Sequence, residues 1–187
     1  KFGANAILGI SMAVAKAAME SGVARKHITD WDAYAAHLKN IMGQESKLTQ
    51  QLYETARRNP QRVVFAEGIH PTMLKAAVEA RNEGICHPIL LGNDEMIAKK
   101  AAELELSLEG IEIINLRHDR EAPRRERFAQ LLAEKRARQG YTFEEANDKM
   151  FERNYFGMMM VETGEADAFI TGVYTKYSNT IKVAKEV

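Results

Sequence analysis

Residues 153–182 read RNYFGMMMVETGEADAFITGVYTKYSNTIK, and three structural signals follow one another along them. The run from Met158 to Val161 shows no polar face, which predicts a helix buried on all sides. Gly164 stands where this helix would end, since glycine adopts the left-handed conformation after a helix without a Cβ penalty. Ala168–Thr171 then predicts a short, buried, central strand.

A polar cluster follows that strand at once. Gly172 comes first, and the hydroxyl and amide side chains that follow it are Tyr174, Thr175, Tyr177, Ser178, Asn179 and Thr180. Ligands of open α/β sheets bind beyond the carboxyl ends of the strands. We therefore expect a ligand-facing loop here, with Thr171, Gly172, Tyr174 and Tyr177 as candidate contacts.

Upstream, apolar strand signals alternate with helical ones. The strand signals are Arg62–Ala66, Pro88–Leu91 and Ile111–Ile114. Pro71 suits the first turn of a helix that reaches Gly84, and Asn93 is an N-cap for the next, with Met96, Ile97 and Ala101 on its apolar stripe. The alternation predicts a three-layer α/β fold, in which a parallel sheet has helices on both faces. Glu67 and Gly68 end the first strand and are weaker ligand candidates.

The region before residue 153 predicts two more helices. A long one runs from Arg124 to Gln139, with Phe128, Leu131 and Leu132 inward, and Gly140 follows it. Thr142 and Glu145 form a capping box that begins the second.

The first 60 residues predict helices only. The signals are a helix from Asn5 to Glu20, a short helix capped by Asp30, a break at Gly43 and a helix from Ser46 to Arg58. We divide the chain into a helical connector, residues 1–43, and an α/β region, residues 44–187.

Composition excludes several classes of partner. The chain has 187 residues, is 45% hydrophobic and carries 26 basic and 26 acidic side chains, so neither nucleic acid nor an anionic membrane is expected. The basic run 117–138 is interleaved with acids and predicts a mixed-charge helix face. A single cysteine, Cys86, fits a reducing cytoplasm, and the five histidines lack metal-ligand spacing.

The apolar run Ala4–Ala15 is shorter than the roughly 20 residues that a membrane helix needs, so we expect it to be part of a soluble helix.

The stretch described first also carries a family resemblance. Phe156-Gly157 through Val161, Gly164 to Ala168, Gly172, and Thr180-Ile181-Lys182 resemble the middle of phosphotransacetylases, which move an acetyl group between coenzyme A and phosphate. The resemblance implies the phosphotransacetylase and isocitrate dehydrogenase-like fold, present here incompletely.

Two further resemblances lie near the start. Lys1 to Ser11 resembles an enolase helix that carries no catalytic residue of that enzyme, whereas Ala13–Ala24 resembles the end of the cofactor domain of bacterial malic enzymes. In one class of malic enzymes a phosphotransacetylase-like domain follows that domain. Residues 28–38 also resemble the connector between the two.

The resemblance assigns two cationic residues to ligand binding. Arg136 matches a substrate-binding arginine of phosphotransacetylases, and its planar guanidinium suits phosphate. Lys182 stands where active transferases have a second anion-binding arginine, which is a departure from the pattern. No catalytic residue and no metal ligand is assigned in this chain.

The resemblance implies part of a cytoplasmic, homo-oligomeric, NADP-dependent malic enzyme, which converts malate to pyruvate and carbon dioxide. NADP and a divalent metal would belong to the parent enzyme, and acetyl-CoA would be the allosteric effector bound by this region. One alternative is an active phosphate acetyltransferase. Others are a structural or oligomerisation module and, more weakly, an enolase.

Overall fold

The computed structural model describes residues 4–24, 26–41 and 47–187. The chain forms two compact units, Lys1–Thr55 and Ala56–Val187, which are described separately. The predicted break at Gly43 and the predicted helix start at Ser46 lie outside the described residues. The division of the chain at residue 43 stays a prediction.

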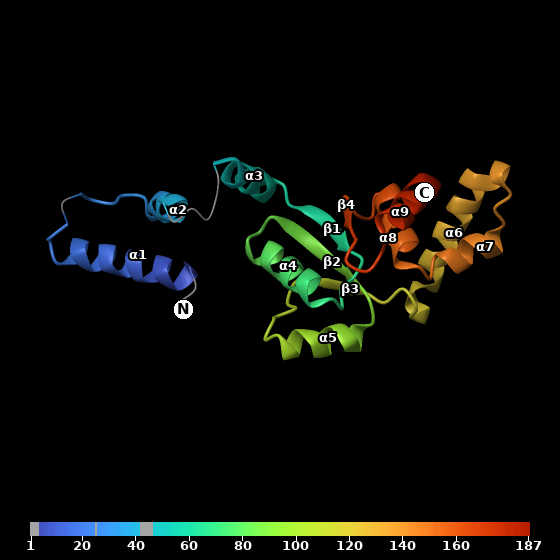
Figure 1. Ribbon diagram of the computed structural model, residues 1–187, viewed down its shortest axis with the longest axis horizontal. Coiled ribbons are helices and arrows are strands. Elements are labelled where there is room, and N and C mark those ends of the chain that lie inside the picture. The colour runs from blue at the N-terminus through green and yellow to red at the C-terminus, as the bar shows by residue number, and fades with distance from the viewer. Residues whose placement is uncertain (1–3, 25, 42–46) are drawn as a thin grey trace. The chain divides into compact units, whose positions relative to one another are not determined.

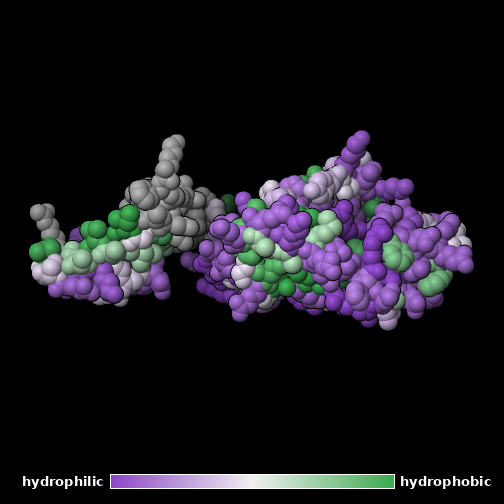
Figure 2. Space-filling view, turned by 90° about the horizontal axis from the view of Figure 1, so that it is seen from below, coloured by the Kyte–Doolittle hydropathy of each residue, from purple (hydrophilic) through white to green (hydrophobic). Residues whose placement is uncertain are grey.

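The first unit is helical, as the sequence predicts. It contains α1 (Ala4–Glu20) and α2 (Trp31–Ile41), and α3 (Lys47–Arg58) begins within it. Asp30 caps α2, because its Oδ1 accepts the Ala33 N–H at 2.9 Å. Ile10 and Val14 of α1 are exposed, and Figure 2 shows an apolar band on this helix.

The second unit is built on a four-stranded parallel sheet, which confirms the predicted fold class. Its strands are β1 (Gln61–Phe65), β2 (Cys86–Leu91), β3 (Glu112–Ile114) and β4 (Ala168–Ile170), in the order β3-β2-β1-β4. The register pairs Val64 with Ile89 on one side and with Phe169 on the other.

The position of β4 corrects the prediction of a buried central strand. Among the described strands it pairs with β1 alone, so it forms an edge of the sheet. Its side chains are accordingly half-buried or exposed, and Ile170 keeps 43% of its surface.

Two helices cover one face of the sheet (Figure 1). They are α4 (Pro71–Asn82) and α5 (Asp94–Glu103), and their inward residues pack on Phe65 and Leu90. Asn93 caps α5 as predicted, its Oδ1 accepting the Met96 N–H at 2.9 Å. Met96 is exposed, contrary to the prediction, because the buried stripe follows the four-residue spacing from Ile97 to Ala101.

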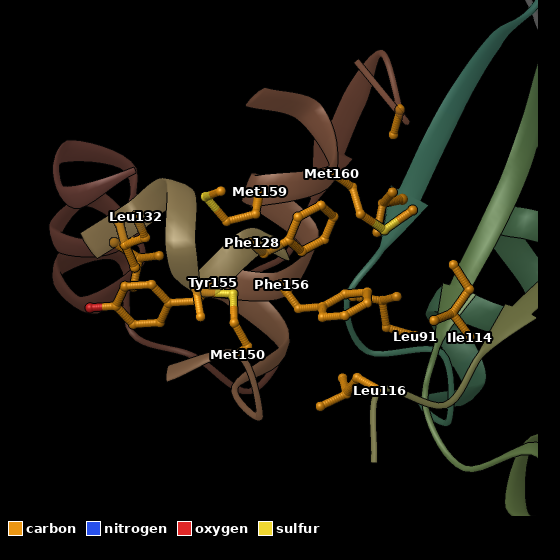
Figure 3. Packing of buried hydrophobic residues seen from close by; sticks show 14 of the residues in the cluster. Leu91, Ile114, Leu116, Phe128, Leu132, Met150, Tyr155, Phe156, Met159 and Met160 are labelled. Atoms are coloured by element: carbon orange, nitrogen blue, oxygen red, sulfur yellow. The ribbon is translucent and has the colours of Figure 1, made fainter. Parts of the chain in front are cut away.

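The other face carries a larger set of helices. In chain order these are η1 (Asp119–Glu121), α6 (Ala122–Arg136), η2 (Ala137–Gln139), α7 (Phe143–Lys149), α8 (Arg153–Glu162) and α9 (Tyr177–Glu186). They enclose the core shown in Figure 3, where Phe128 of α6 meets Phe156 of α8 edge to face at 5.3 Å. The Thr142–Glu145 capping box is present.

Two burial predictions on this face are wrong in detail. Leu131 is 41% exposed, because the buried residues of α6 are Arg125, Phe128, Ala129 and Leu132, at three- and four-residue spacing. Met158 and Val161 are half-buried, so α8 has a partly open side rather than being buried all round. Gly164 follows α8 at φ +74°, as its position predicts.

Candidate functional site

The carboxyl ends of β1 and β4 meet where the strand order reverses. The chain passes outward from β1 through β2 to β3 and then returns to the far side of β1 as β4. In doubly wound sheets the ligand crevice lies at this reversal. The residues that follow β1 and β4 are therefore the candidate site.

Glu67 is the polar centre of this site. It is 2% exposed, and its Oε1 accepts the Gly172 N–H at 3.2 Å and lies 3.0 Å from Thr171 Oγ1. Thr171 Oγ1 also lies 3.1 Å from Asn154 Oδ1, so its single proton serves one of two acceptors. Oε2 of Glu67 has no hydrogen-bond partner among the described residues. A buried, unpaired carboxylate oxygen is costly, and a donor from a ligand would relieve that cost.

An aromatic pair borders the same loop. His70 caps α4 by accepting the Thr72 N–H on Nδ1 at 3.2 Å, which leaves Nε2 as the protonated nitrogen of its neutral form. The Tyr174 ring packs edge to face on His70, with centroids 5.1 Å apart. Tyr174 stays exposed and is available to a ligand.

The sequence-predicted ligand residues divide into two groups. Gly172 and Tyr174 lie together beyond β1 and β4, whereas Arg136 and Lys182 both lie by the last turn of α9. Tyr177 is exposed at the first residue of α9. The stretch from Tyr177 to Thr180 thus forms the start of a helix, which corrects the prediction of a loop. Sequence reasoning missed the spacing that turns half-buried Thr180 and buried Val183 toward the core.

Arg136 is engaged with the backbone of α9. Its Nε donates to the carbonyl of Glu186 at 2.6 Å, and its Nη2 donates to the carbonyl of Lys185. Arg136 therefore contacts the backbone of the last two residues of α9.

Lys182 reaches the same turn from the side. Its ammonium is 3.9 Å from Glu186 Oε1, and the side chain is 73% exposed. Glu186 also accepts hydrogen bonds from the hydroxyls of Tyr141 and Tyr155. Burial acts to raise the pKa of Glu186, but these hydrogen bonds and the charges of Lys149 and Lys182 outweigh it, and the pKa falls. Burial, with the hydrogen bond to Glu186, raises the pKa of Tyr155 to about 12.

A second hollow lies beyond β2 and β3. Its volume is about 510 Å³, and Gly92, Asn93, Arg117, His118 and Arg153 are among its lining residues. The mixed-charge helix face predicted for most of residues 117–138 does not extend to Arg117 and His118, which precede the helix. Their position just after the third strand signal was the available clue, and it is the same clue that selected Gly172.

Metal and membrane features can be checked over the described ranges. Residues 4–24, 26–41 and 47–187 contain no group of three or more His, Cys, Asp or Glu side chains placed to hold a metal ion. Within the same ranges, none of the helices combines the length and the apolar character needed to cross a membrane.

Comparison with known proteins gives one family and two kinds of relative. The phosphate acetyl/butaryl transferase family model matches residues 47–187. An NADP-dependent malic enzyme of Rhizobium meliloti is 35% identical over 179 residues, which are 94% of this chain and 23% of that enzyme. The NADP-dependent malic enzyme of Escherichia coli is 34% identical over 97% of this chain and 24% of its own length. A phosphate acetyltransferase of Corynebacterium glutamicum is 34% identical over 73% of this chain and 40% of its length.

Solved structures agree with the family match. The EutD phosphotransacetylase from Staphylococcus aureus superposes with a TM-score of 0.63 at 26% identity, over 74% of this chain and 42% of that one. A phosphotransacetylase from Streptococcus pyogenes gives the same TM-score over 76% of this chain and 43% of that one. The chain spans about a quarter of the malic enzymes and less than half of the transferases.

Proposed function

The chain belongs to the phosphate acetyl/butaryl transferase family, and we propose that it serves as the acetyl-CoA-binding regulatory region of an NADP-dependent malic enzyme. The malic enzymes are similar over nearly the whole chain, whereas the named transferases are similar over about three quarters of it. This longer likeness favours the malic enzyme reading.

The proposed ligand position is the crevice beyond β1 and β4. The free Oε2 of Glu67 would accept an N–H from the amide-bearing arm of acetyl-CoA, and Tyr174 offers an exposed ring beside it. Glu67 also contacts Thr171 and Gly172, which follow β4, so a ligand bound to Glu67 would change the position of these residues and of β4. That coupling is the kind that a regulatory site requires.

The observation that carries the proposal is the state of the two cationic residues by α9. The guanidinium of Arg136 donates to helix carbonyls, and the exposed ammonium of Lys182 is near the carboxylate of Glu186. Acetyl transfer to phosphate needs preorganised cations where charge develops, and a guanidinium provides a two-point contact that an ammonium lacks. We therefore propose that acetyl-CoA binds and that transfer is lost.

The second candidate is an active phosphate acetyltransferase. The 34% identity to the Corynebacterium transferase favours it, as does the presence of an arginine at position 136. In that case Arg136 would leave the α9 carbonyls when phosphate binds.

We propose that the NADP and divalent metal implied by the malic enzyme relatives are held elsewhere in a longer polypeptide. We include assembly into homo-oligomers and a cytoplasmic location in the same proposal.

Two assays test the proposal together. We expect acetyl-CoA to inhibit malate oxidation by the polypeptide that contains this chain, with no acetyl phosphate formed from acetyl-CoA and phosphate. The Lys182→Arg variant is the matched comparison in both assays, because it places the arginine of the active pattern at this exposed position of α9. Acetyl phosphate turnover by the unaltered protein would instead establish the transferase. If acetyl-CoA does not inhibit malate oxidation and no acetyl phosphate is formed, only a structural role would remain.

A further inference from the structure

We propose that the hollow of about 510 Å³ beyond β2 and β3 is a separate anion site that takes an organic phosphate, bound by Arg117 and Arg153. It lies at the same carboxyl edge of the sheet as the Glu67 crevice. None of Glu67, Thr171 and Gly172 lines it. The inference stands independently of the acetyl-CoA proposal, because it uses different residues.

The first argument is the charge of the lining. Among the described residues, those that line the hollow include two arginines and one histidine, and none of them is an aspartate or glutamate. Neither Arg117 nor Arg153 makes an ion pair with any residue that the structure describes. Two unpaired guanidinium groups at one hollow give it a positive potential that attracts anions.

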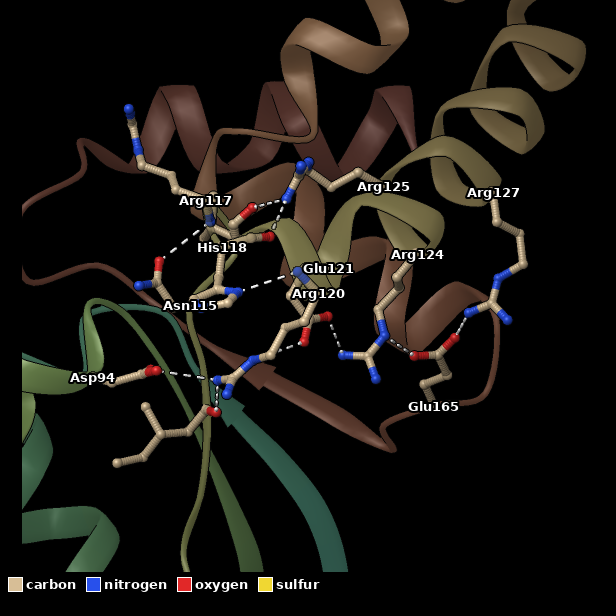
Figure 4. A network of polar contacts seen from close by, with 12 residues as sticks. Asp94, Asn115, Arg117, His118, Arg120, Glu121, Arg124, Arg125, Arg127 and Glu165 are labelled. Atoms are coloured by element: carbon tan, nitrogen blue, oxygen red, sulfur yellow. Dashed lines mark hydrogen bonds and ion pairs between the residues drawn. The ribbon is translucent and has the colours of Figure 1, made fainter.

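A neighbouring cavity of about 850 Å³ provides the contrast. It too is lined by arginines, but Arg124 there lies between Glu121 at 2.9 Å and Glu165 at 3.2 Å, and Arg127 also contacts Glu165 (Figure 4). Its charges are already neutralised within the protein. Figure 4 shows that Arg117 contacts Asn115 through its backbone N–H, while its guanidinium points away from the ion pairs of Arg124 and Arg127. The smaller hollow is therefore the better anion site.

The second argument is the start of α8. Arg153 is the first residue of this ten-residue helix, its N-cap Glu152 makes no side-chain hydrogen bond, and the first turn carries no acidic side chain. The N-terminus of a helix has free N–H groups and a partial positive charge, which a cation makes less favourable. A bound phosphate would accept from these groups and offset the repulsion.

The third argument is preorganisation of the wall. Arg125 is 7% exposed, and its Nη1 donates to the carbonyls of Leu116 at 2.6 Å and His118 at 3.0 Å. Its guanidinium also lies 4.6 Å from the ring centroid of Phe151, which lines the hollow too. One buried side chain thus contacts three lining residues, and a site that is fixed before binding loses less entropy when its ligand arrives.

The rest of the lining indicates the class of ligand. Ile69, Leu116 and Phe151 contribute apolar surface beside the arginines. Gly92 lets the backbone lie close to Ile69, since a Cβ at residue 92 would be 3.3 Å from Ile69 Cγ1. Small-molecule sites combine such apolar walls with a few directed polar groups, within about 300–1,000 Å³. An organic phosphate fits this mixture better than a bare ion does.

Calorimetric titration of the 187-residue chain tests the site, with ADP as the organic phosphate and inorganic phosphate as the bare anion. We expect ADP to bind more tightly. Loss of one charge-assisted hydrogen bond should raise the Kd at least about tenfold in Arg117→Gln and in Arg153→Gln. Arg138→Gln is the matched control, because Arg138 is an exposed arginine of the same unit outside the hollow, and it should leave the Kd unchanged.

Other outcomes decide against the proposal. The proposal would be overturned if the unaltered chain and the Arg117→Gln, Arg153→Gln double variant bound ADP with equal affinity. It would also be overturned if the unaltered chain did not bind ADP at millimolar concentration. Acetyl-CoA is then titrated into the double variant. Retained acetyl-CoA affinity keeps the two sites separate, whereas parallel loss of both ligands would merge them and remove the second site. Unchanged melting temperatures show that each variant is folded.

Discussion

Close packing of α8 on β4 makes Gly157 a sensitive position. A Cβ at residue 157 would lie 2.3 Å from Phe169 Cε2 and 2.6 Å from Phe169 Cδ2, with Leu91 Cδ1 at 3.3 Å. Contacts under 3.0 Å require that something move, and the atoms that must move belong to a ring packed on the core. In Gly157→Ala we therefore expect β4, or the Phe169 ring, to shift.

The expected loss of stability follows from two opposing effects. Overpacking a well-packed core costs about 1–3 kcal/mol. Replacing glycine by alanine inside a helix stabilises the helix by about 1 kcal/mol. Because the contact at 2.3 Å is severe, the overpacking cost lies in the upper part of that range, about 2–3 kcal/mol, and the net loss is about 1–2 kcal/mol. For a unit of this size this loss corresponds to a fall in Tm of about 3–8 °C.

Thermal melting followed by circular dichroism measures this effect, with two controls. Gly9→Ala in α1 meets nothing within 4 Å of the new Cβ and should not destabilise its helix. Phe169→Leu shortens the opposing side chain, so the cost of Gly157→Ala should be smaller in that background. A Gly157→Ala protein that melts at or above the unaltered Tm would refute the close packing of α8 on β4.

Three further predictions concern the second unit. Hydrogen bonds from Arg62 hold the pKa of Asp167 at about 2, below its usual 3.8. The contribution of Asp167 to the free energy of unfolding should therefore be complete above about pH 4 and disappear as the pH falls toward 2. In Asp167→Asn the urea midpoint should vary less with pH over this range. Thr142→Ala removes the capping box and should cost about 1 kcal/mol in urea unfolding. Leu132→Ala should cost about 2–5 kcal/mol, whereas Leu131→Ala, at an exposed position, should cost under about 1 kcal/mol; equal values would contradict the orientation of α6.

Local sequence signals predicted the elements well. Asn93 and the Thr142–Glu145 pair mark helix starts through side-chain oxygens that cap their own backbone, and this chemistry needs no distant partner. The strands were recognisable for a similar reason, since their apolar runs are continuous in a sheet covered on both faces.

The errors concern properties that distant contacts determine. The sequence of Ala168–Ile170 does not reveal that β4 has one neighbouring strand, because edge and central strands share the same apolar residues. In the polar stretch from Tyr177 the local sign of a helix was weak, since it consisted of the spacing from Thr180 to Val183, and α9 is also held by Arg136 and Tyr155 from other elements.

The candidate site shows the same division. Position after a strand selected Glu67, Gly172 and Tyr174, which the fold does bring together. The same rule applied to Arg117 would have selected the second hollow. Its lack of an acidic partner could be recognised only in three dimensions.

The central claim is tested most directly by acetyl-CoA titration into the polypeptide that contains this chain, followed by assay of the same sample for acetyl phosphate after phosphate is added. The account predicts saturable binding, weakened in Glu67→Ala, and no acetyl phosphate above the level without protein. Sustained acetyl phosphate formation would contradict the regulatory function, and absence of any acetyl-CoA binding would contradict the assignment of the crevice itself.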